Sequence, residues 1–178
     1  MRNIKMYVFL AFLLFFSGCA SARQYYSGGS SAPRFDSNSS VYILLPQDAM
    51  YYSRVCIGSG RSIAQIISDS FSRHLTRIET SGEVEELADG LKKAKEKGYA
   101  YLVSSKIIRW EDANTGWSGK VDKIQMQMSI YDVQTNNLLH SVDFEGNSSW
   151  FLAGIFGCRP YYIVSKSIDD YVANLFRS

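Results

Sequence analysis

Apolar and polar residues alternate without interruption from Lys123 to Tyr131. A period of two is typical of a β-strand with one face against a core and the other against water or polar neighbours. This segment therefore requires a sheet that has at least one apolar face to cover. The apolar positions are Ile124, Met126, Met128 and Ile130.

The flanking segments extend this strand into an antiparallel meander. The run from Tyr99 to Arg109 is strand-like, and Leu138 to Glu145 forms a return strand. Asn136 and Asn137 separate the second and third strands, and asparagine tolerates the positive φ that a tight turn needs. We therefore predict three consecutive strands in one sheet.

The remaining apolar patterns predict one short buried strand, three helices and a further short strand. Val41–Leu45 is an apolar run that Pro46 ends. Apolar residues at three- and four-residue spacing predict an amphipathic helix from Ile63 to Ile78, with Ser62 and Gln65 as its capping box. A short strand follows at 77–80, a second helix at 84–94 before Gly98, and a last helix after Pro160.

This element order favours an α/β domain of the α+β kind, with one mixed sheet that includes the antiparallel three-strand meander. About three helices pack on the sheet. We place the single folded domain at residues 41–178.

The N-terminus has the pattern of a secretory signal. A basic start, Arg2 and Lys5, precedes an apolar stretch from Tyr7 to Phe16 that is too short for a bilayer span of roughly 20 residues. Small residues and Cys19 follow, so residues 1–18 resemble a bacterial lipoprotein signal peptide, in which Cys19 is acylated and becomes the mature N-terminus.

Residues 19–40 comprise this cysteine and a stretch rich in Ser and Gly without an apolar period. We predict a flexible tether here, with a reach of roughly 25 Å. Ala20 follows Cys19 in place of the Asp that would resemble an inner-membrane retention signal. We therefore expect a Gram-negative envelope lipoprotein on the periplasmic face of the outer membrane, with membrane lipid as a partner through Cys19.

The charge balance argues against nucleic acid as a partner. Removal of the signal takes away two basic residues and no acids, which leaves the mature chain formally neutral, with 17 of each. Nucleic-acid binders carry a basic excess or cluster. We expect no cofactor, and no metal site, because His74 and His140 have no ligand spacing to each other or to a cysteine.

Cys56 and Cys158 remain once Cys19 carries lipid. Disulfides persist in the periplasm, and both residues lie just upstream of a predicted helix. We expect either a Cys56–Cys158 disulfide or two buried thiols.

The segment from Arg109 to Lys123 is the candidate interaction surface. It connects two strands and combines aromatic residues, acids and glycines, which suits recognition of a partner. The alternative is structural, with both tryptophans closing the base of the hairpin. The candidate residues are Trp110, Glu111, Asp112, Trp117, Ser118, Gly119, Asp122 and Lys123.

An enzyme is a weaker interpretation. Glu111 and Asp112 are adjacent on a strand, so their side chains point to opposite faces and cannot act together across a cleft. A Gly-x-Ser-x-Gly elbow is missing, and His140 is expected at the edge of the core. No catalytic residue is assigned.

The segment YLVSSKIIRWEDANTGWSGKVDKIQMQMSIYDVQTNNLL resembles a bacterial outer-membrane lipoprotein family catalogued as a domain of unknown function. The family carries similar Trp-Glu-Asp and Trp-Ser-Gly motifs, a basic-flanked strand ending in Tyr-Asp, and the ILLPQD run. The match covers most of residues 41–176. Cys56, Cys158 and the aromatic stretch Trp150–Phe156 depart from the family pattern.

This resemblance implies an outer-membrane lipoprotein without a known activity. The element order is more loosely similar to envelope-assembly lipoproteins and to the N-terminal domain of the Tol translocation protein, which mostly bind proteins. We expect an envelope protein as partner and a docking or structural role. The alternative is a module that binds a small ligand or a cell-wall glycan through Trp110 and Trp117.

Overall fold

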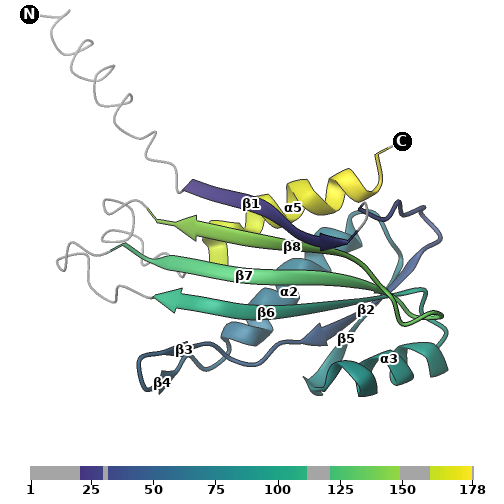
Figure 1. The fold of residues 1–178 in the computed structure, drawn as a ribbon, viewed down its shortest axis with the longest axis horizontal. Coiled ribbons are helices and arrows are strands. Elements are labelled where there is room, and N and C mark those ends of the chain that lie inside the picture. Colours follow the sequence, from purple (N-terminus) through teal and green to yellow (C-terminus); the bar gives the residue numbers. More distant parts are fainter. Residues whose placement is uncertain (1–20, 30–31, 112–120, 149–160, 178) are drawn as a thin grey trace, which may run out of the picture.

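The computed structural model describes residues 21–29, 32–111, 121–148 and 161–177. They form a mixed six-stranded sheet with the order β1-β8-β7-β6-β2-β5, a small two-stranded sheet, and three helices (Figure 1). The sheet strands are β1 Ser21–Gly29, β2 Ser40–Leu45, β5 Arg77–Val84, β6 Tyr101–Glu111, β7 Lys123–Asp132 and β8 Leu138–Asn147. The small sheet contains β3 Met50–Tyr51 and β4 Arg54–Val55, and the helices are α2 Ser59–Ser72, α3 Leu87–Glu96 and α5 Tyr161–Leu175.

The predicted meander is confirmed. β6, β7 and β8 pair antiparallel in sequence order, whereas β2 pairs parallel with both β5 and β6. Asn136, in the turn before β8, has a φ of 58°, as expected for a tight turn. The α+β class predicted from the sequence is therefore correct.

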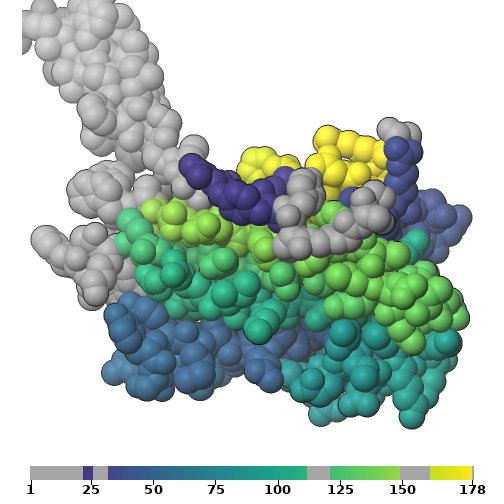
Figure 2. Space-filling view, in the orientation of Figure 1, coloured from purple at the N-terminus to yellow at the C-terminus, as the bar shows by residue number. Residues whose placement is uncertain are grey.

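Helices cover the two faces of the sheet unequally. The alternating apolar residues of β7 are fully buried in a core that α2 and α5 also line. Val41, Ile43 and Val103 belong to that core, while their neighbours Tyr42 and Leu102 point to the opposite face and pack with α3. Much of that second face stays open, and Figure 2 shows β6, β7 and β8 as a band across it.

The largest difference from the sequence analysis concerns the predicted tether. Ser21–Gly29 is an edge strand that pairs antiparallel with β8, from Ser21 opposite Asn147 to Gly29 opposite His140. Phe35 is buried in the core, and its backbone N–H donates to the carbonyl of Leu175 at 2.9 Å. A Ser- and Gly-rich segment can pair because a strand ladder uses backbone groups, which every residue but proline offers.

Helix α2 both begins and ends earlier than the predicted helix from Ile63 to Ile78, since Ile78 belongs to β5, and it lacks the predicted capping box. Ser62 Oγ donates back to the carbonyl of Gly58, and Gln65 Nε2 donates to Asp69. The carboxylate of Asp48 satisfies the first N–H groups of the helix instead. No helix among the described residues has the length and apolar character needed to cross a bilayer.

His140 lies inside the domain, as expected from the sequence. Its Nδ1 is 2.8 Å from the hydroxyl oxygen of Tyr171, and the two rings stack with an interplanar angle of 14°. This pair connects β8 to α5. Burial lowers the pKa of His140, because the buried environment disfavours the charged imidazolium.

We predict that acid weakens the domain through this residue. The unfolded chain protonates His140 with a pKa of about 6.5, so unfolded molecules bind more protons and stability falls as the pH drops below that value. Replacement by glutamine keeps a polar group beside Tyr171 and removes the titration. The melting temperature of His140→Gln should therefore fall less between about pH 7 and pH 5 than that of the wild type. Parallel pH profiles would contradict this.

Candidate functional site

The described residues of the predicted surface close one end of the sheet. Trp110 is 6% exposed and packs in the core, with its ring centroid 6.2 Å from that of Tyr161. Asp122 is buried, and its backbone N–H donates to Ser148 Oγ at 2.9 Å. The Trp110 ring therefore does not offer a stacking platform, and its position matches the structural alternative.

The rim of this end is charged. Glu111 lies 3.6 Å from the Arg109 guanidinium and 3.6 Å from the Lys123 ammonium, and all three side chains are partly exposed. Such surface ion pairs contribute little to stability. Asp112, Trp117, Ser118 and Gly119 lie outside the described residues, as do Cys19 and Cys158.

Cys56 is partly buried against the core, and its backbone N–H donates to the carbonyl of Ala49 at 2.8 Å. Because Cys158 lies outside the described residues, their pairing stays a prediction. Among the described residues, no group of three or more His, Cys, Asp or Glu side chains could hold a metal ion.

A groove lies where β6 continues beyond its neighbour β2. The two strands pair over three positions, which end at Ile43 opposite Val103. Within the described strands, the rest of β6, Ser104–Glu111, pairs with β7 alone. The backbone groups that face away from β7 in this part of β6 therefore have no ladder partner among the described strands, although β3 lies beside part of it, and they form a sheet edge available for pairing.

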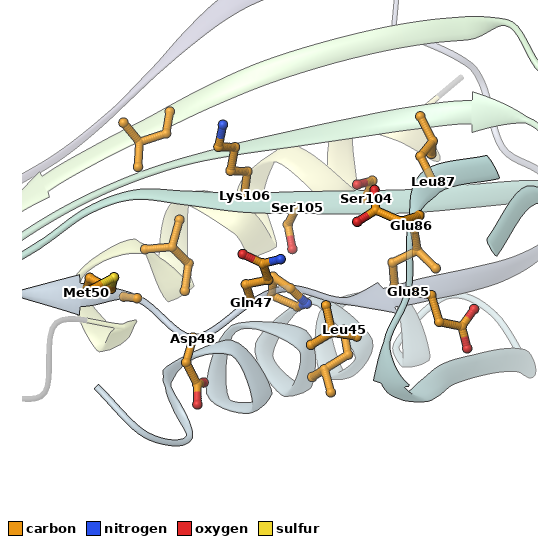
Figure 3. Close-up of a pocket in the computed structure, with 16 residues that line it drawn as sticks. Leu45, Gln47, Asp48, Met50, Glu85, Glu86, Leu87, Ser104, Ser105 and Lys106 are labelled. Atoms are coloured by element: carbon orange, nitrogen blue, oxygen red, sulfur yellow. The ribbon is translucent and has the colours of Figure 1, made fainter. Parts of the chain in front are cut away.

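This groove, which we call the β6-edge groove, has a volume of about 570 Å³ (Figure 3). Ser104–Ile108 of β6 form one wall, and the turn at Leu45–Met50 forms the other. Val84–Leu87, which runs from the last residue of β5 to the first residue of α3, also lines it. Met50, Val84 and Ile108 are among the large apolar side chains exposed to solvent, so the groove offers both backbone groups and apolar contacts.

The wall opposite β6 is held rigidly by the start of α2. The Asp48 carboxylate accepts hydrogen bonds from the backbone N–H groups of Gly58, at 3.0 Å, and Gly60, at 2.8 Å. Ala49 N–H donates to Ser59 Oγ at 2.8 Å. A carboxylate at a helix N-terminus is also favoured by the helix dipole. The loop that follows β2 is thus fixed at a distance from β6.

Two buried oxygen atoms near the groove lack a hydrogen-bond partner among the described residues, namely Ser105 Oγ and Glu85 Oε2. The Glu85 side chain is 7% exposed, and its other carboxylate oxygen accepts from Lys93 Nζ at 2.7 Å. That bond raises the pKa of Lys93. Buried polar atoms without a partner are uncommon in folded proteins, so Ser105 marks the β6-edge groove as a candidate ligand site. The Glu85 carboxylate also lines a second hollow with Tyr42, Lys93 and Lys97.

The sequence analysis did not identify the β6-edge groove. The available signal was the difference in length between the predicted strands 41–45 and 99–109. Strand length alone does not say where the shorter partner sits along the longer one, so this signal could not locate the open edge.

Comparisons with known proteins identify a family and a fold. A family model described as "Domain of unknown function (DUF4823)" matches residues 33–175. The PelC dodecamer from Paraburkholderia phytofirmans is 14% identical with a TM-score of 0.66, and the match covers 89% of this chain and 99% of that one. No curated protein matches the chain.

Two further solved structures are similar. The hypothetical protein CT253 from Chlamydia trachomatis is 10% identical with a TM-score of 0.50, over 77% of this chain and 94% of that one. Lipoprotein GNA1162 from Neisseria meningitidis is 13% identical with a TM-score of 0.43, over 76% and 99%. At such identities, the likeness to PelC and CT253 shows a shared fold.

The wall of the groove yields a stability prediction. Asp48→Ala removes the side-chain cap of α2 and should lower the free energy of unfolding by about 1 kcal/mol. Gly60→Ala should cost more, because the added Cβ would overlap the carbonyl oxygen of Pro46. Gly82→Ala is the matched control, since a Cβ there meets nothing within 4 Å. Chemical denaturation measures all three, and equal stability of the two alanine variants at 60 and 82 would refute the close approach.

Proposed function

The chain belongs to the DUF4823 family, whose description names no activity, and from this premise we propose that it is a lipid-anchored protein-docking module of the Gram-negative cell envelope. Acylated Cys19 holds it on the periplasmic face of the outer membrane. Its partner is an envelope protein, and the docking surface is the β6-edge groove.

The open edge of β6 is the observation that carries this proposal. A strand edge with unused backbone donors and acceptors binds an extended peptide segment as an additional strand. The main-chain hydrogen bonds supply affinity, and flanking pockets select alternate side chains. Exposed Met50, Val84 and Ile108 are suited to contact apolar side chains of such a segment.

The edge also has features that limit indiscriminate pairing. Lys106 is exposed on the part of β6 that extends beyond β2, and the register of β6 against β7 shifts between Ile107 and Arg109. A lysine and a bulge are common protection against edge-to-edge aggregation. These features favour a partner with a matching sequence over any free strand.

A second copy of this chain is one such partner. PelC, which shares the fold, is described as a dodecamer. In a homo-oligomer, the segment that pairs with β6 comes from a neighbouring copy of the chain. The mass of a crosslinked product separates a homo-oligomer from a complex with another protein.

Photo-crosslinking in living cells tests the docking surface. A photoreactive amino acid at Lys106, in the full acylated chain, should give a discrete adduct with one protein. The matched control is Glu145, which is exposed on the same face of the sheet but lies on β8, a strand paired on both sides. Identical adducts from both positions, or none from Lys106 despite efficient incorporation, would overturn the proposal.

Two neighbouring proline substitutions separate docking from folding. Successive N–H groups of a strand point to opposite sides, so one of Ser104 and Ser105 donates toward β7 and the other toward the open edge. One of Ser104→Pro and Ser105→Pro should therefore lower the melting temperature by removing a ladder bond. The other should keep the melting temperature near that of the wild type and abolish the Lys106 adduct. If the adduct survives in the folded variant, strand addition is excluded.

A further inference from the structure

The start of β1 fixes which end of the sheet faces the acyl anchor. Pairing places Ala22 beside Gly146, Gly146 beside Ile124, and Ile124 beside Trp110, in one row across four strands. Ser21 lies one residue closer to that end. Cys19 precedes Ser21 by two residues, which span at most about 7 Å. An acylated Cys19 therefore holds the start of β1 close to the bilayer surface.

The hairpin of β3 and β4 lies at the same end. Trp110, in that row, shares a small hollow with Cys56, Ile57 and Tyr161. Figure 1 agrees, since the β3–β4 hairpin and the start of β1 lie toward the same end of the molecule. The loop after the hairpin therefore lies at the end of the sheet that carries the start of β1, with β8, β7 and β6 between them.

Exposed apolar side chains are concentrated on this hairpin and the loop that follows. Tyr52 is 82% exposed, Val55 54% and Ile57 91%. Tyr52 is at the hairpin tip with a φ of 53°, a conformation that non-glycine residues seldom adopt. A positive φ is what a two-residue hairpin turn requires, and it places the exposed Tyr52 at the tip. The other exposed apolar residues of the described domain are more dispersed.

The positive charge of residues 50–65 is complementary to an anionic lipid surface. From Met50 to Gln65 the chain has no acidic residue and two arginines, Arg54 and Arg61, both exposed. Tyrosine prefers the headgroup level of a membrane, and arginine extends its charge toward phosphates while its stem covers apolar surface. Anionic lipids attract such basic residues near the surface.

We infer that the β3–β4 hairpin and its following loop form a second membrane contact, in which Tyr52, Val55 and Ile57 enter the headgroup region and Arg54 binds lipid phosphate. This inference rests on the acyl anchor of the proposed function. The contact orients the domain, because an anchor at one point and a hairpin at another leave little freedom to tilt. The β6-edge groove then keeps one orientation relative to the membrane.

Fluorescence in vesicles tests this contact. The full acylated protein is reconstituted into vesicles of phosphatidylethanolamine and phosphatidylglycerol, with an environment-sensitive fluorescent amino acid at Ser53. Its emission should shift to the blue on reconstitution, and lipids with brominated chains should quench it. The matched control carries the same fluorophore at Gln134, an exposed turn position at the opposite end of the sheet, and should show neither effect.

Substitutions identify the side chains responsible. Tyr52→Ser combined with Ile57→Ser should abolish the blue shift and quenching at Ser53, and Leu138→Ser, at the far end, should leave both unchanged. These side chains are exposed, so the variants should keep the wild-type melting temperature. Equal quenching at Ser53 and Gln134, or no loss in the double variant, would overturn the inference.

The outcome is independent of protein docking. If Ser53 is not quenched while Lys106 still gives a protein adduct, the membrane contact is refuted and the docking proposal stands. If Ser53 is quenched while Lys106 gives no adduct, the membrane contact is supported and the docking proposal fails.

Discussion

The mismatch in length between β2 and β6 underlies both surfaces that we propose to be functional. β2 has 6 residues and β6 has 11, and they pair over three positions. Pro46 follows β2 directly and has no N–H to continue a ladder, so the chain turns away from the sheet there. Asp48 then fixes this turn to the start of α2. The open edge of β6 and the β3–β4 hairpin both result from the chain leaving the sheet at Pro46.

The pairing of β1 with β8 gives these surfaces an orientation. A flexible segment of residues 19–40 would let the domain rotate freely above the membrane. With Ser21–Gly29 in the sheet, a single residue, Ala20, separates the predicted acylation site from the folded domain. Trp110 and Glu111 lie in rows that pair across the sheet to the start of β1, so the anchor also restricts where these residues lie.

Much of the fold was predictable from the sequence, because it depends on apolar periodicity and on turn residues, both of which can be recognised in the linear sequence. The alternation in β7 predicted the buried row correctly, and Asn136 and Gly98 adopt the positive φ that their positions suggested. Burial of His140 followed from its apolar neighbours. The strand β1 was missed because backbone pairing needs no apolar period, and β3 and β4 were missed because two residues are too few to show one.

The candidate site was harder to predict than the fold. Trp110 was a candidate contact residue because it is aromatic and lies beside charged residues. Those features do not distinguish an exposed ring from one that is buried at the end of the core, as Trp110 is. The groove is made of residues from three separate parts of the chain, 44–50, 84–87 and 104–108, and none of their residue types indicates a binding site by itself. Its defining property is that β6 has no ladder partner among the described strands beside Ser104–Glu111 on the side away from β7. This property arises from the topology and cannot be recognised from the types of the individual residues.

Hydrogen exchange of the β1 backbone amides tests the central claim most directly. The full acylated chain, reconstituted in vesicles, is placed in deuterated buffer, and peptides covering Ser21–Gly29 are followed by mass spectrometry. Pairing with β8 predicts that about half of these amides exchange slowly, because N–H groups alternate between the partner strand and the outer edge. Uniform exchange at the rate of an unstructured chain would show that this segment is a tether, and the orientation derived from it would be wrong.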